Sequence, residues 1–429
     1  MKLLCTADIH IGRRSTKIPA DLDGRRFSSA IAWNAIVDFA LRARVDALLL
    51  AGDIVDHGNR YFEAYGPLEA GLKRLAAEKI HTVAVAGNHD HDVLFRLESY
   101  VGTEFFHLLG QNNRWETFTL QRDEMDIVRI VGWSFPSARF PTNPLPSFPS
   151  KHPGGVPIVG LMHADVGQTQ SVYAPVLVDE LQRLPVSAWV VGHVHASNWT
   201  RAAGKPSILL PGSPQALDPG EPGRHGPWLL HISPAGDVEA EHVPLSRVRY
   251  ESLPVDLSDV HEEADWEPCV PQAIRQYISE HENELGEAEL LLFRVLLQGR
   301  TRLHGRLPEW IRSLQNDFRI HQNQAEARIE QVHLETRPAL DLALTARAND
   351  PPGILARLLL DLESDEHSSS FNLLHEAMER ISQVFRHNAF SPIANEDEKP
   401  SIANARRTLI REGYLLLDSL LAQQEGKSR

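Results

Sequence analysis

The sequence is poor in the features that mark secreted and membrane-spanning proteins. Its 429 residues contain only two cysteines, Cys5 and Cys269, which are too few for a disulfide framework. No apolar stretch approaches the roughly 20 residues that a membrane helix needs. The first ten residues turn polar too early to form the apolar core of a secretory signal. We therefore expect a soluble, cytoplasmic protein without a membrane partner.

Basic residues are not in excess, which excludes a histone-like or polybasic protein. The chain carries 43 Lys and Arg against 57 Asp and Glu, a net charge of −14. Residues 1–250 contain 26 acidic and 24 basic residues, so the remaining 31 acidic and 19 basic residues give residues 251–429 a net charge of −12. Phosphate contacts fit the nearly neutral first half better. The negative charge of the second half can also be explained without any binding role, because it would keep the protein soluble.

The first half instead contains a series of short apolar runs that end abruptly at polar residues. The runs are rich in Val, Ile and Leu, which predicts strands buried on both faces, at residues 1–5, 47–51, 81–86, 158–162 and 188–191. Residues 29–43 and 67–79 have the apolar spacing of helices. This alternation predicts an α/β sandwich with its ligands at the carboxyl ends of the strands. The Gly- and Pro-rich segments 134–157 and 211–226 are expected to be loops.

The pattern changes beyond residue 250. Residues 271–282 and 307–318 are predicted helices, and residues 289–297 and 327–335 are predicted strands, which indicates a small α+β domain. From residue 350 onward the sequence favours helices, with apolar stripes in residues 372–385 and 403–423. We expect three domains, at residues 1–245, 246–348 and 349–429.

The predicted strands of the first half end in side chains that bind metals. These are Asp8, His10, Asp53, Asn88, His163, His193 and His195. Divalent metals of intermediate hardness favour such a mixed oxygen and imidazole set over thiolates, and Mn²⁺ suits it well. Seven ligands are too many for one ion but match two, which can share a carboxylate and stabilise both oxygens of a phosphoryl transfer. A single Asp-X-His is usually structural and a Gly-His-X-His is only moderately suggestive, whereas this order at five strand ends predicts a two-metal centre.

In this order the motifs strongly resemble those of the calcineurin-like metallophosphoesterases. They are Asp8-Ile9-His10, Gly52-Asp53-Ile54-Val55-Asp56, Gly87-Asn88-His89-Asp90, His163 and Gly192-His193-Val194-His195. The resemblance implies a four-layer α/β/β/α sandwich followed by a small α+β capping domain and C-terminal helices. It also implies how the two metals divide the ligands. One ion would be held by Asp8, His10, Asp53 and His195, and the other by Asp53, Asn88, His163 and His193.

The same resemblance assigns parts to residues beside the ligands. It implies that His89 contacts the phosphate and helps to protonate or stabilise the leaving oxygen. It leaves Asp56 and Asp90 to orient the metal ligands. Other histidines near the motifs are interpreted as surface or loop residues; they are His57, His91, His107 and His152.

Two segments resemble one branch of the superfamily more closely. The opening residues 2–13 (KLLCTADIHIGR) and residues 211–216 (PGSPQA) are similar to SbcD-type DNA repair exonucleases, in a divergent branch similar to the YhaO type. The resemblance is specific over residues 1–245 and loose beyond. It implies a Mn²⁺-dependent 3′–5′ exonuclease on duplex DNA ends that works as a homodimer with an SMC-type, SbcC-like coiled-coil ATPase.

The role of the C-terminal half stays open. Residues 372–385 and 403–423 would supply an ATPase-binding segment in that family, or would equally well pack on their own capping domain. The metal site alone also fits a phosphoesterase for a small nucleotide or cyclic nucleotide, although such an enzyme has no need of the long C-terminal half. A third possibility is a non-catalytic scaffold of an ATPase complex, which has no need of the complete ligand set or of His89.

Overall fold

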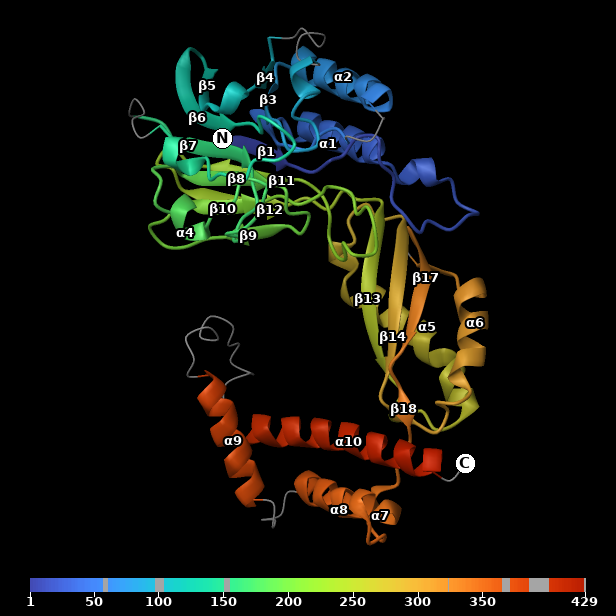
Figure 1. Ribbon diagram of the computed structural model, residues 1–429. Coiled ribbons are helices and arrows are strands. Elements are labelled where there is room, and N and C mark those ends of the chain that lie inside the picture. The colour runs from blue at the N-terminus through green and yellow to red at the C-terminus, as the bar shows by residue number, and fades with distance from the viewer. Residues whose placement is uncertain are drawn as a thin grey trace. The chain divides into compact units, whose positions relative to one another are not determined.

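The computed structural model describes residues 1–56, 61–96, 104–149, 155–322, 324–364, 371–385 and 401–427 (Figure 1). His57 and His152 lie outside these ranges. The chain divides into two compact units, residues 1–299 with 306–335 and residues 300–305 with 336–429. None of the helices in the described ranges combines the length and the hydropathy that crossing a bilayer requires.

The first unit contains two six-stranded sheets. One has the strand order β12-β11-β1-β2-β3-β4. Its parallel strands are β1 (Lys2–Thr6), β2 (Ala47–Ala51), β3 (His81–Val85) and β4 (Phe106–Leu108). Beyond β1, β11 (Trp228–Ile232) pairs antiparallel with β1 and with the edge strand β12 (Val238–His242).

The other six-stranded sheet has the order β5-β6-β7-β8-β10-β9. Its parallel strands are β6 (Met125–Trp133), β7 (Ile158–His163), β8 (Ala188–Gly192) and β10 (Ser207–Leu210). The antiparallel edge strands are β5 (Glu116–Arg122) and β9 (Asn198–Thr200).

The two sheets pack face to face, and each is covered on its outer face. Leu49 and Val83 of the first sheet share a buried apolar core with Ile130 and Val190 of the second. The helices α1 (Ser29–Ala43) and α2 (Tyr61–Ala77) pack against the outer face of the first sheet (Figure 1). The outer face of the second sheet is covered by loops, the 3-10 helix η3 (Leu145–Ser147) and the short helix α4 (Val178–Leu181). The predicted α/β class is confirmed, with a fourth layer made mostly of loop.

A smaller four-stranded sheet follows in the same unit. Its order is β13-β14-β17-β16, with β13 (Val248–Asp256), β14 (Leu290–Gln298), β17 (Ala325–Leu334) and β16 (Ile320–Gln322). The helices α5 (Glu263–Glu280) and α6 (Leu307–Asp317) belong to this α+β domain. Further 3-10 helices are η1 (Gly24–Phe27), η2 (Gln111–Asn113) and η4 (Glu282–Glu284).

Two helices begin earlier than the sequence predicts, and both contain proline within the helix. Helix α5 begins at Glu263 and contains both Pro268 and Pro271. Helix α2 begins at Tyr61 and contains Pro67, whose carbonyl accepts a 2.9 Å hydrogen bond from Trp33 Nε1 of α1. This contact fixes the proline inside the helix.

Within its described residues, the second unit contains helices and the two-residue strands β15 (Arg300–Thr301) and β18 (Arg337–Pro338). Its helices are α7 (Leu342–Thr345), α8 (Pro351–Glu363), α9 (Phe371–Phe385) and α10 (Ile402–Lys427). Leu359 of α8 and Leu417 of α10 are fully buried in a small core that the unit forms by itself. Part of the apolar stripe of α10 is therefore covered within its own unit.

Candidate metal centre

The seven predicted metal ligands converge where β1, β2, β3, β7 and β8 end. Asp8 and His10 follow β1, Asp53 follows β2, and Asn88 follows β3. The second sheet contributes His163 at the end of β7 and both His193 and His195 just after β8. Parallel strands bring their carboxyl ends to one edge, which is why short motifs far apart in the sequence meet here.

Two overlapping groups of side chains form the centre. In the first, ligand atoms of Asp8, His10 and His195 all lie within 4.8 Å of one another. His195 Nε2 is 3.3 Å from His10 Nε2 and 3.9 Å from Asp8 Oδ1.

In the second group, ligand atoms of Asp8, Asp53 and His163 lie within the same limit of 4.8 Å. His163 Nε2 is 3.3 Å from Asp53 Oδ2 and 3.2 Å from Asn88 Oδ1. The ring of His193 lies 5.2 Å from that of His163, and its backbone N–H donates to Asp8 Oδ2 at 3.0 Å. The structure therefore brings all seven predicted ligands together.

Several of these residues adopt a backbone conformation that side chains normally disfavour. The φ angles are 50° for Asp8, 49° for His10, 50° for Asp53 and 95° for His193. Left-handed conformations of non-glycine residues cost about 1–3 kcal/mol each and persist where the surrounding structure enforces them. Such clustered strain is typical of functional sites.

The hydrogen bonds of His163 test whether these residues fit a cation. Its Nδ1 lies 2.9 Å from the carbonyl oxygen of Ala51, which can only accept, so Nδ1 carries the hydrogen. The lone pair of Nε2 then faces the oxygens of Asp53 and Asn88. Burial alone would lower the pKa of His163, but the negative charge of Asp53 outweighs it and raises the pKa to about 9. The surroundings of His163 Nε2, Asp53 Oδ2 and Asn88 Oδ1 therefore favour a positive charge, which a divalent metal ion would supply.

His195 is held in the same tautomer by a residue that the sequence analysis missed. Its Nδ1 lies 2.5 Å from Glu221 Oε1, so its Nε2 also presents a lone pair to Asp8 and His10. Burial opposes the charged imidazole, while the hydrogen bond to Glu221 raises the pKa of His195. Glu221 lies in the Gly- and Pro-rich segment that was interpreted as a connection, and no spacing rule singles it out.

Carboxylate, imidazole and amide donors without thiolates suit two divalent ions of intermediate hardness. One ion would be held by Asp8, His10, Asp53 and His195, and the other by Asp53, Asn88, His163 and His193. This division remains a prediction from the family resemblance. The distances show that each proposed ligand lies beside at least one other member of its set.

His89 stands at the exposed side of the cluster. Its backbone N–H donates to Asp53 Oδ1 at 2.8 Å, and its ring meets that of His10 edge-on at 4.9 Å. The side chain is 39% exposed, so a substrate can reach it. Asp56 Oδ1 lies 3.6 Å from His10 Nδ1 and 3.9 Å from His89 Nδ1, which suits the predicted orienting role of Asp56.

Asp90 is completely buried and acts on the backbone rather than on a ligand side chain. Its Oδ2 accepts hydrogen bonds from Ile54 N–H at 2.6 Å and Val55 N–H at 3.2 Å. Its Oδ1 accepts one from Gly87 N–H at 2.7 Å. Asp90 therefore fixes the loops that present Asp53 and Asn88.

Of the other histidines near the motifs, His91 and His107 lie within the described ranges. His91 Nδ1 lies 3.2 Å from the carbonyl oxygen of Asn88. His107 is not a surface or loop residue, because it lies on β4 and its ring stacks on Phe118 at 3.9 Å. Burial lowers the pKa of His107 to about 4, which marks it as a neutral packing residue.

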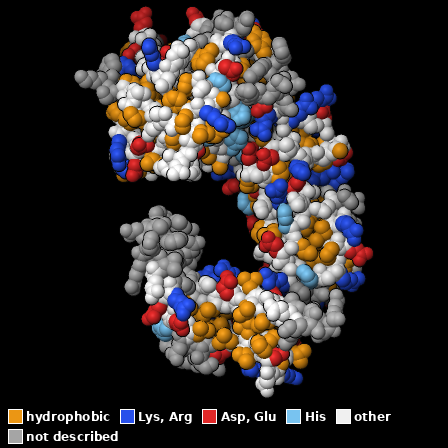
Figure 2. Space-filling model, in the orientation of Figure 1, with side chains coloured by type: hydrophobic (Ala, Val, Ile, Leu, Met, Phe, Trp, Pro, Cys, Tyr) orange, Lys and Arg blue, Asp and Glu red, His pale blue; other side chains and the backbone are white. Residues whose placement is uncertain are grey.

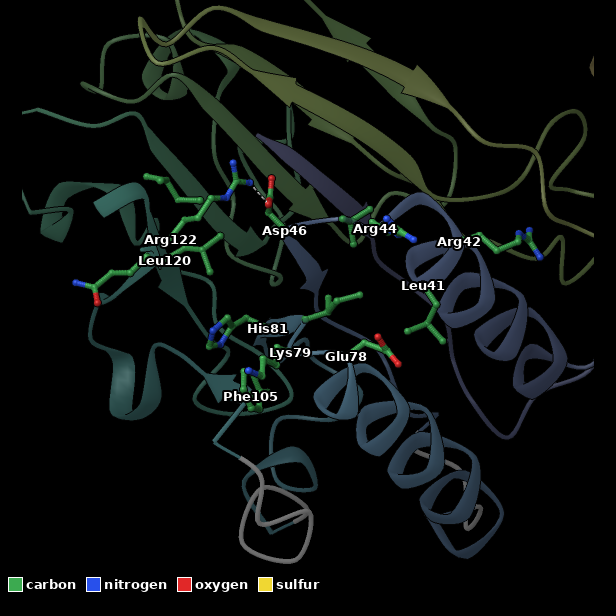
Figure 3. Close-up of a pocket in the computed structure, with 14 residues that line it drawn as sticks. Leu41, Arg42, Arg44, Asp46, Glu78, Lys79, His81, Phe105, Leu120 and Arg122 are labelled. Atoms are coloured by element: carbon green, nitrogen blue, oxygen red, sulfur yellow. Dashed lines mark hydrogen bonds and ion pairs between the residues drawn. The ribbon is translucent and has the colours of Figure 1, made fainter. Parts of the chain in front are cut away.

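A pocket of about 830 Å³ lies at the other edge of the first sheet, where β2 and β3 begin (Figure 3). Its cationic side chains are exposed; they belong to Arg42, Arg44, Lys79 and Arg122. Arg44 caps α1 and Lys79 follows α2, positions where a cation offsets the helix dipole. Arg122 forms an ion pair with Asp46. None of the predicted site residues lines this pocket, which we regard as separate from the metal centre.

Comparison with known proteins agrees with this geometry. Residues 1–197 match the family model for calcineurin-like phosphoesterases, and residues 250–337 match the model for the middle domain of metallophosphoesterase YhaO. The uncharacterized metallophosphoesterase YhaO of Bacillus subtilis (strain 168) is 26% identical over 234 residues, which cover 52% of this chain and 54% of the relative. The match thus spans about half the length of that protein.

Solved structures with some likeness include a dimetal phosphatase from Danio rerio, at 13% identity and a TM-score of 0.34, over 54% of this chain and 92% of that one. Another is the calcineurin-like phosphoesterase YfkN from Bacillus subtilis, at 13% identity and a TM-score of 0.35, over 66% of this chain and 98% of that one. Both TM-scores are below 0.5, so these structures add nothing to the two family matches. Residues 1–197 are thus similar to calcineurin-like phosphoesterases, and residues 250–337 are similar to the middle domain of metallophosphoesterase YhaO.

Proposed function

We propose that this chain is a Mn²⁺-dependent nuclease that hydrolyses phosphodiester bonds from duplex DNA ends in the 3′–5′ direction. We further propose that it works in DNA repair in the cytoplasm, as a homodimer with an SMC-type, SbcC-like coiled-coil ATPase. The observation that carries the hydrolytic reaction is the convergence of seven metal-ligand side chains beside the exposed His89.

The chemistry divides between the metals and the chain. When bound, two divalent ions supply the Lewis acidity that activates water and neutralises negative charge on a phosphate. The chain holds the ligands in fixed tautomers and places His89 where it can donate a proton to a leaving oxygen. Burial lowers the pKa of His89, which makes its protonated form a stronger acid. Asp56 lies beside both His10 and His89 and keeps their rings in place.

Cationic side chains close to the metal centre in the sequence support the proposal that the substrate is a polyanion such as DNA. Arg13, Arg14 and Lys17 lie in the loop that follows His10, and Arg14 and Lys17 are exposed. The backbone N–H of Arg13 donates to the carbonyl of His10 at 3.0 Å, which ties the loop to the metal site. Figure 2 shows histidine side chains gathered with Lys and Arg side chains on the visible face of this domain. Such cations contact the phosphates of a DNA backbone without reading its sequence.

Exposed apolar side chains on the helical unit support the proposal of an ATPase partner. Leu344, Ile354 and Leu416 are 61%, 60% and 54% exposed, and Figure 2 shows a group of apolar side chains on this unit. Because the covered part of α10 already packs on α8, a partner helix would bind the remaining apolar face.

The test is Mn²⁺-dependent degradation of linear, end-labelled duplex DNA. We expect digestion by the wild-type protein and its loss in Asp53→Ala and His89→Ala, with His333→Ala as an exposed histidine control. Survival of the DNA together with hydrolysis of bis-p-nitrophenyl phosphate or a cyclic nucleotide would contradict the nuclease assignment. Adding a coiled-coil ATPase encoded beside the gene separates a wrong substrate from a missing partner.

A binding experiment tests the cationic loop separately. Replacing Arg14 and Lys17 together by serine removes two phosphate contacts, so the slope of log affinity against log salt should fall by about 2. The matched control replaces Arg201 and Lys205, which are exposed in the turn between β9 and β10, away from the carboxyl ends of the strands. Equal slopes in both double variants would show that DNA does not lie on the loop after His10.

A further inference from the structure

Glu221 holds the ring of His195 from outside the metal-ligand motifs. Its carboxylate is largely buried, with 12% of the side chain exposed, and Oε1 lies 2.5 Å from His195 Nδ1. The second oxygen, Oε2, accepts hydrogen bonds from Leu217 N–H at 2.8 Å and from Ser213 Oγ at 3.3 Å. Both carboxylate oxygens are thus fixed, and the direction of the His195 lone pair is fixed with them.

The hydrogen bonds continue from Glu221 into the middle domain. Leu217, whose N–H contacts Glu221, accepts a 2.8 Å hydrogen bond at its carbonyl from Thr16 N–H. The carbonyl of Thr16 in turn accepts from the hydroxyl of Tyr250. Tyr250 lies on β13 and is only 1% exposed. One path of consecutive contacts therefore joins a middle-domain side chain to a predicted metal ligand.

Further contacts hold the same segment against β13. Gln215 bridges two serines, donating to Ser15 Oγ at 3.0 Å and accepting from Ser246 Oγ at 3.1 Å. Gly223 N–H donates to the carbonyl of Tyr250 at 3.0 Å. The ring of Tyr250 packs in a core that includes Ala216. Residues 213–223 thus lie between the loop after His10 and the first strand of the middle domain.

We propose that Glu221 is a positioning residue of the metal centre and that Tyr250 fixes its position, so that packing of the middle domain and metal binding at His195 are coupled. The inference rests on the proposed function because it takes His195 to bind a divalent metal. A carboxylate that accepts from the far nitrogen of a metal-bound histidine fixes the tautomer and raises the basicity of the ligand. Coupling between two sites acts equally in both directions, so metal binding also strengthens the contact at Tyr250.

A titration of the metal-free 429-residue chain with MnCl₂ in a calorimeter measures the effect without any substrate. We expect two ions to bind the wild-type protein. In Glu221→Gln one ion should bind about 10–100-fold more weakly, while the other is unchanged. Tyr250→Phe, which removes only a hydroxyl, should lower the affinity for the same ion by up to about tenfold.

Tyr277→Phe is the matched control. Tyr277 lies on α5 of the same domain, and its hydroxyl accepts a 3.3 Å hydrogen bond from Arg249, outside the path to His195. A merely structural role of Tyr250 predicts that both tyrosine variants lose stability alike and that neither changes metal affinity. The proposal predicts a loss of affinity in Tyr250→Phe alone.

Hydrogen–deuterium exchange supplies the reverse measurement. MnCl₂ should slow exchange in residues 13–18 and 246–252 of the wild-type protein and have no such effect in Glu221→Gln. The proposal is overturned if Tyr250→Phe binds Mn²⁺ with the affinity of the wild-type protein. This variant tests the proposal by itself if Glu221→Gln does not fold. A wild-type chain that binds no Mn²⁺ overturns the proposed function as well, whereas a chain that binds Mn²⁺ but leaves DNA intact overturns the proposed function alone.

Discussion

The carboxylate of Asp90 accepts a 2.6 Å hydrogen bond from the backbone N–H of Ile54 and thereby joins the third metal-binding motif to the second. Asp53 precedes Ile54, and Asn88 lies two residues before Asp90. Two proposed ligands from neighbouring strands are thus held in register by one buried side chain through hydrogen bonds to backbone N–H groups.

Asp90→Asn should destabilise the protein. The amide replaces one carboxylate oxygen with an N–H₂ donor that faces the backbone donors of Ile54 and Val55 or of Gly87, so buried N–H groups lose their acceptor. Such a loss costs about 2–3 kcal/mol of unfolding free energy, which lowers the melting temperature by about 3–4 °C in a unit of this size. Thermal unfolding of the metal-free protein measures this decrease in melting temperature. Asp92→Asn, at an exposed neighbouring position, is the control. Equal melting temperatures for the two variants would refute the proposal that Asp90 stabilises the loops of the metal centre.

Gly87→Ala should remove metal binding while the fold persists. A Cβ at this position would lie 2.1 Å from Asp53 Oδ1 and 2.6 Å from the Asp53 backbone nitrogen, so the proposed bridging carboxylate must move. A displacement of about 1 Å at such a site costs on the order of 100-fold in function. A Mn²⁺ titration measures the loss. Gly24→Ala, where the added Cβ meets nothing within 4 Å, should bind like the wild type.

Mn²⁺ should raise the melting temperature of the metal-free protein. A divalent ion binds the carboxylates of Asp8 and Asp53 together with the imidazoles in the folded state, whereas the unfolded chain gathers no such site. At about 100 times the dissociation constant the gain is about 2.7 kcal/mol, or about 4 °C in melting temperature. EDTA should reverse the rise. An equal rise in Asp53→Asn would place the stabilising ion elsewhere.

Acid should destabilise the chain through His242 on the edge strand β12. Burial lowers the pKa of His242 to about 4, and the charges of Arg224 and Arg249 act in the same direction. The unfolded histidine binds a proton near pH 6.5. As the pH falls from about 6.5 to about 4, the unfolded state therefore gains a proton that the folded state cannot accept, and the free energy of unfolding decreases.

We expect this decrease to be about 1 kcal/mol, because partial exposure of the ring reduces the roughly 3 kcal/mol that the full shift would give. In His242→Phe the ring still packs near Trp228, and the decrease should be smaller. Urea unfolding at about pH 7.5 and about pH 5 measures it. His261→Phe, at an exposed position, should keep the wild-type dependence, and the assignment fails if the two variants behave alike.

The sequence predicts which side chains converge at the carboxyl ends of the strands, because parallel strands obey a simple rule. The predicted bounds of helix 29–43 and strand 47–51 agree with α1 and β2, and the side chains after each buried strand meet at one edge. No such rule covers the antiparallel strands at the sheet edges. Strands such as β5, β9 and β12 are half exposed, and their residues do not form the apolar runs from which a strand was inferred.

The residues that support the ligands are the ones that sequence patterns miss. Glu221 lies in a Gly- and Pro-rich segment and meets His195 only because the chain folds back after β10. The left-handed backbone of Asp8, His10 and Asp53 is equally hidden, since nothing in these residue types requires a positive φ. Such features depend on the surrounding structure, which local patterns do not encode.

The tripeptide Asn88-His89-Asp90 has a consequence for how this protein can vary. Its three side chains point to different targets: Asn88 to His163, His89 to the open side of the centre, and Asp90 back into the core. Substitutions can therefore separate metal binding, proton transfer and loop support one at a time. A one-residue insertion or deletion would rotate all three side chains out of place together, so this short stretch should accept point changes yet tolerate no change in length.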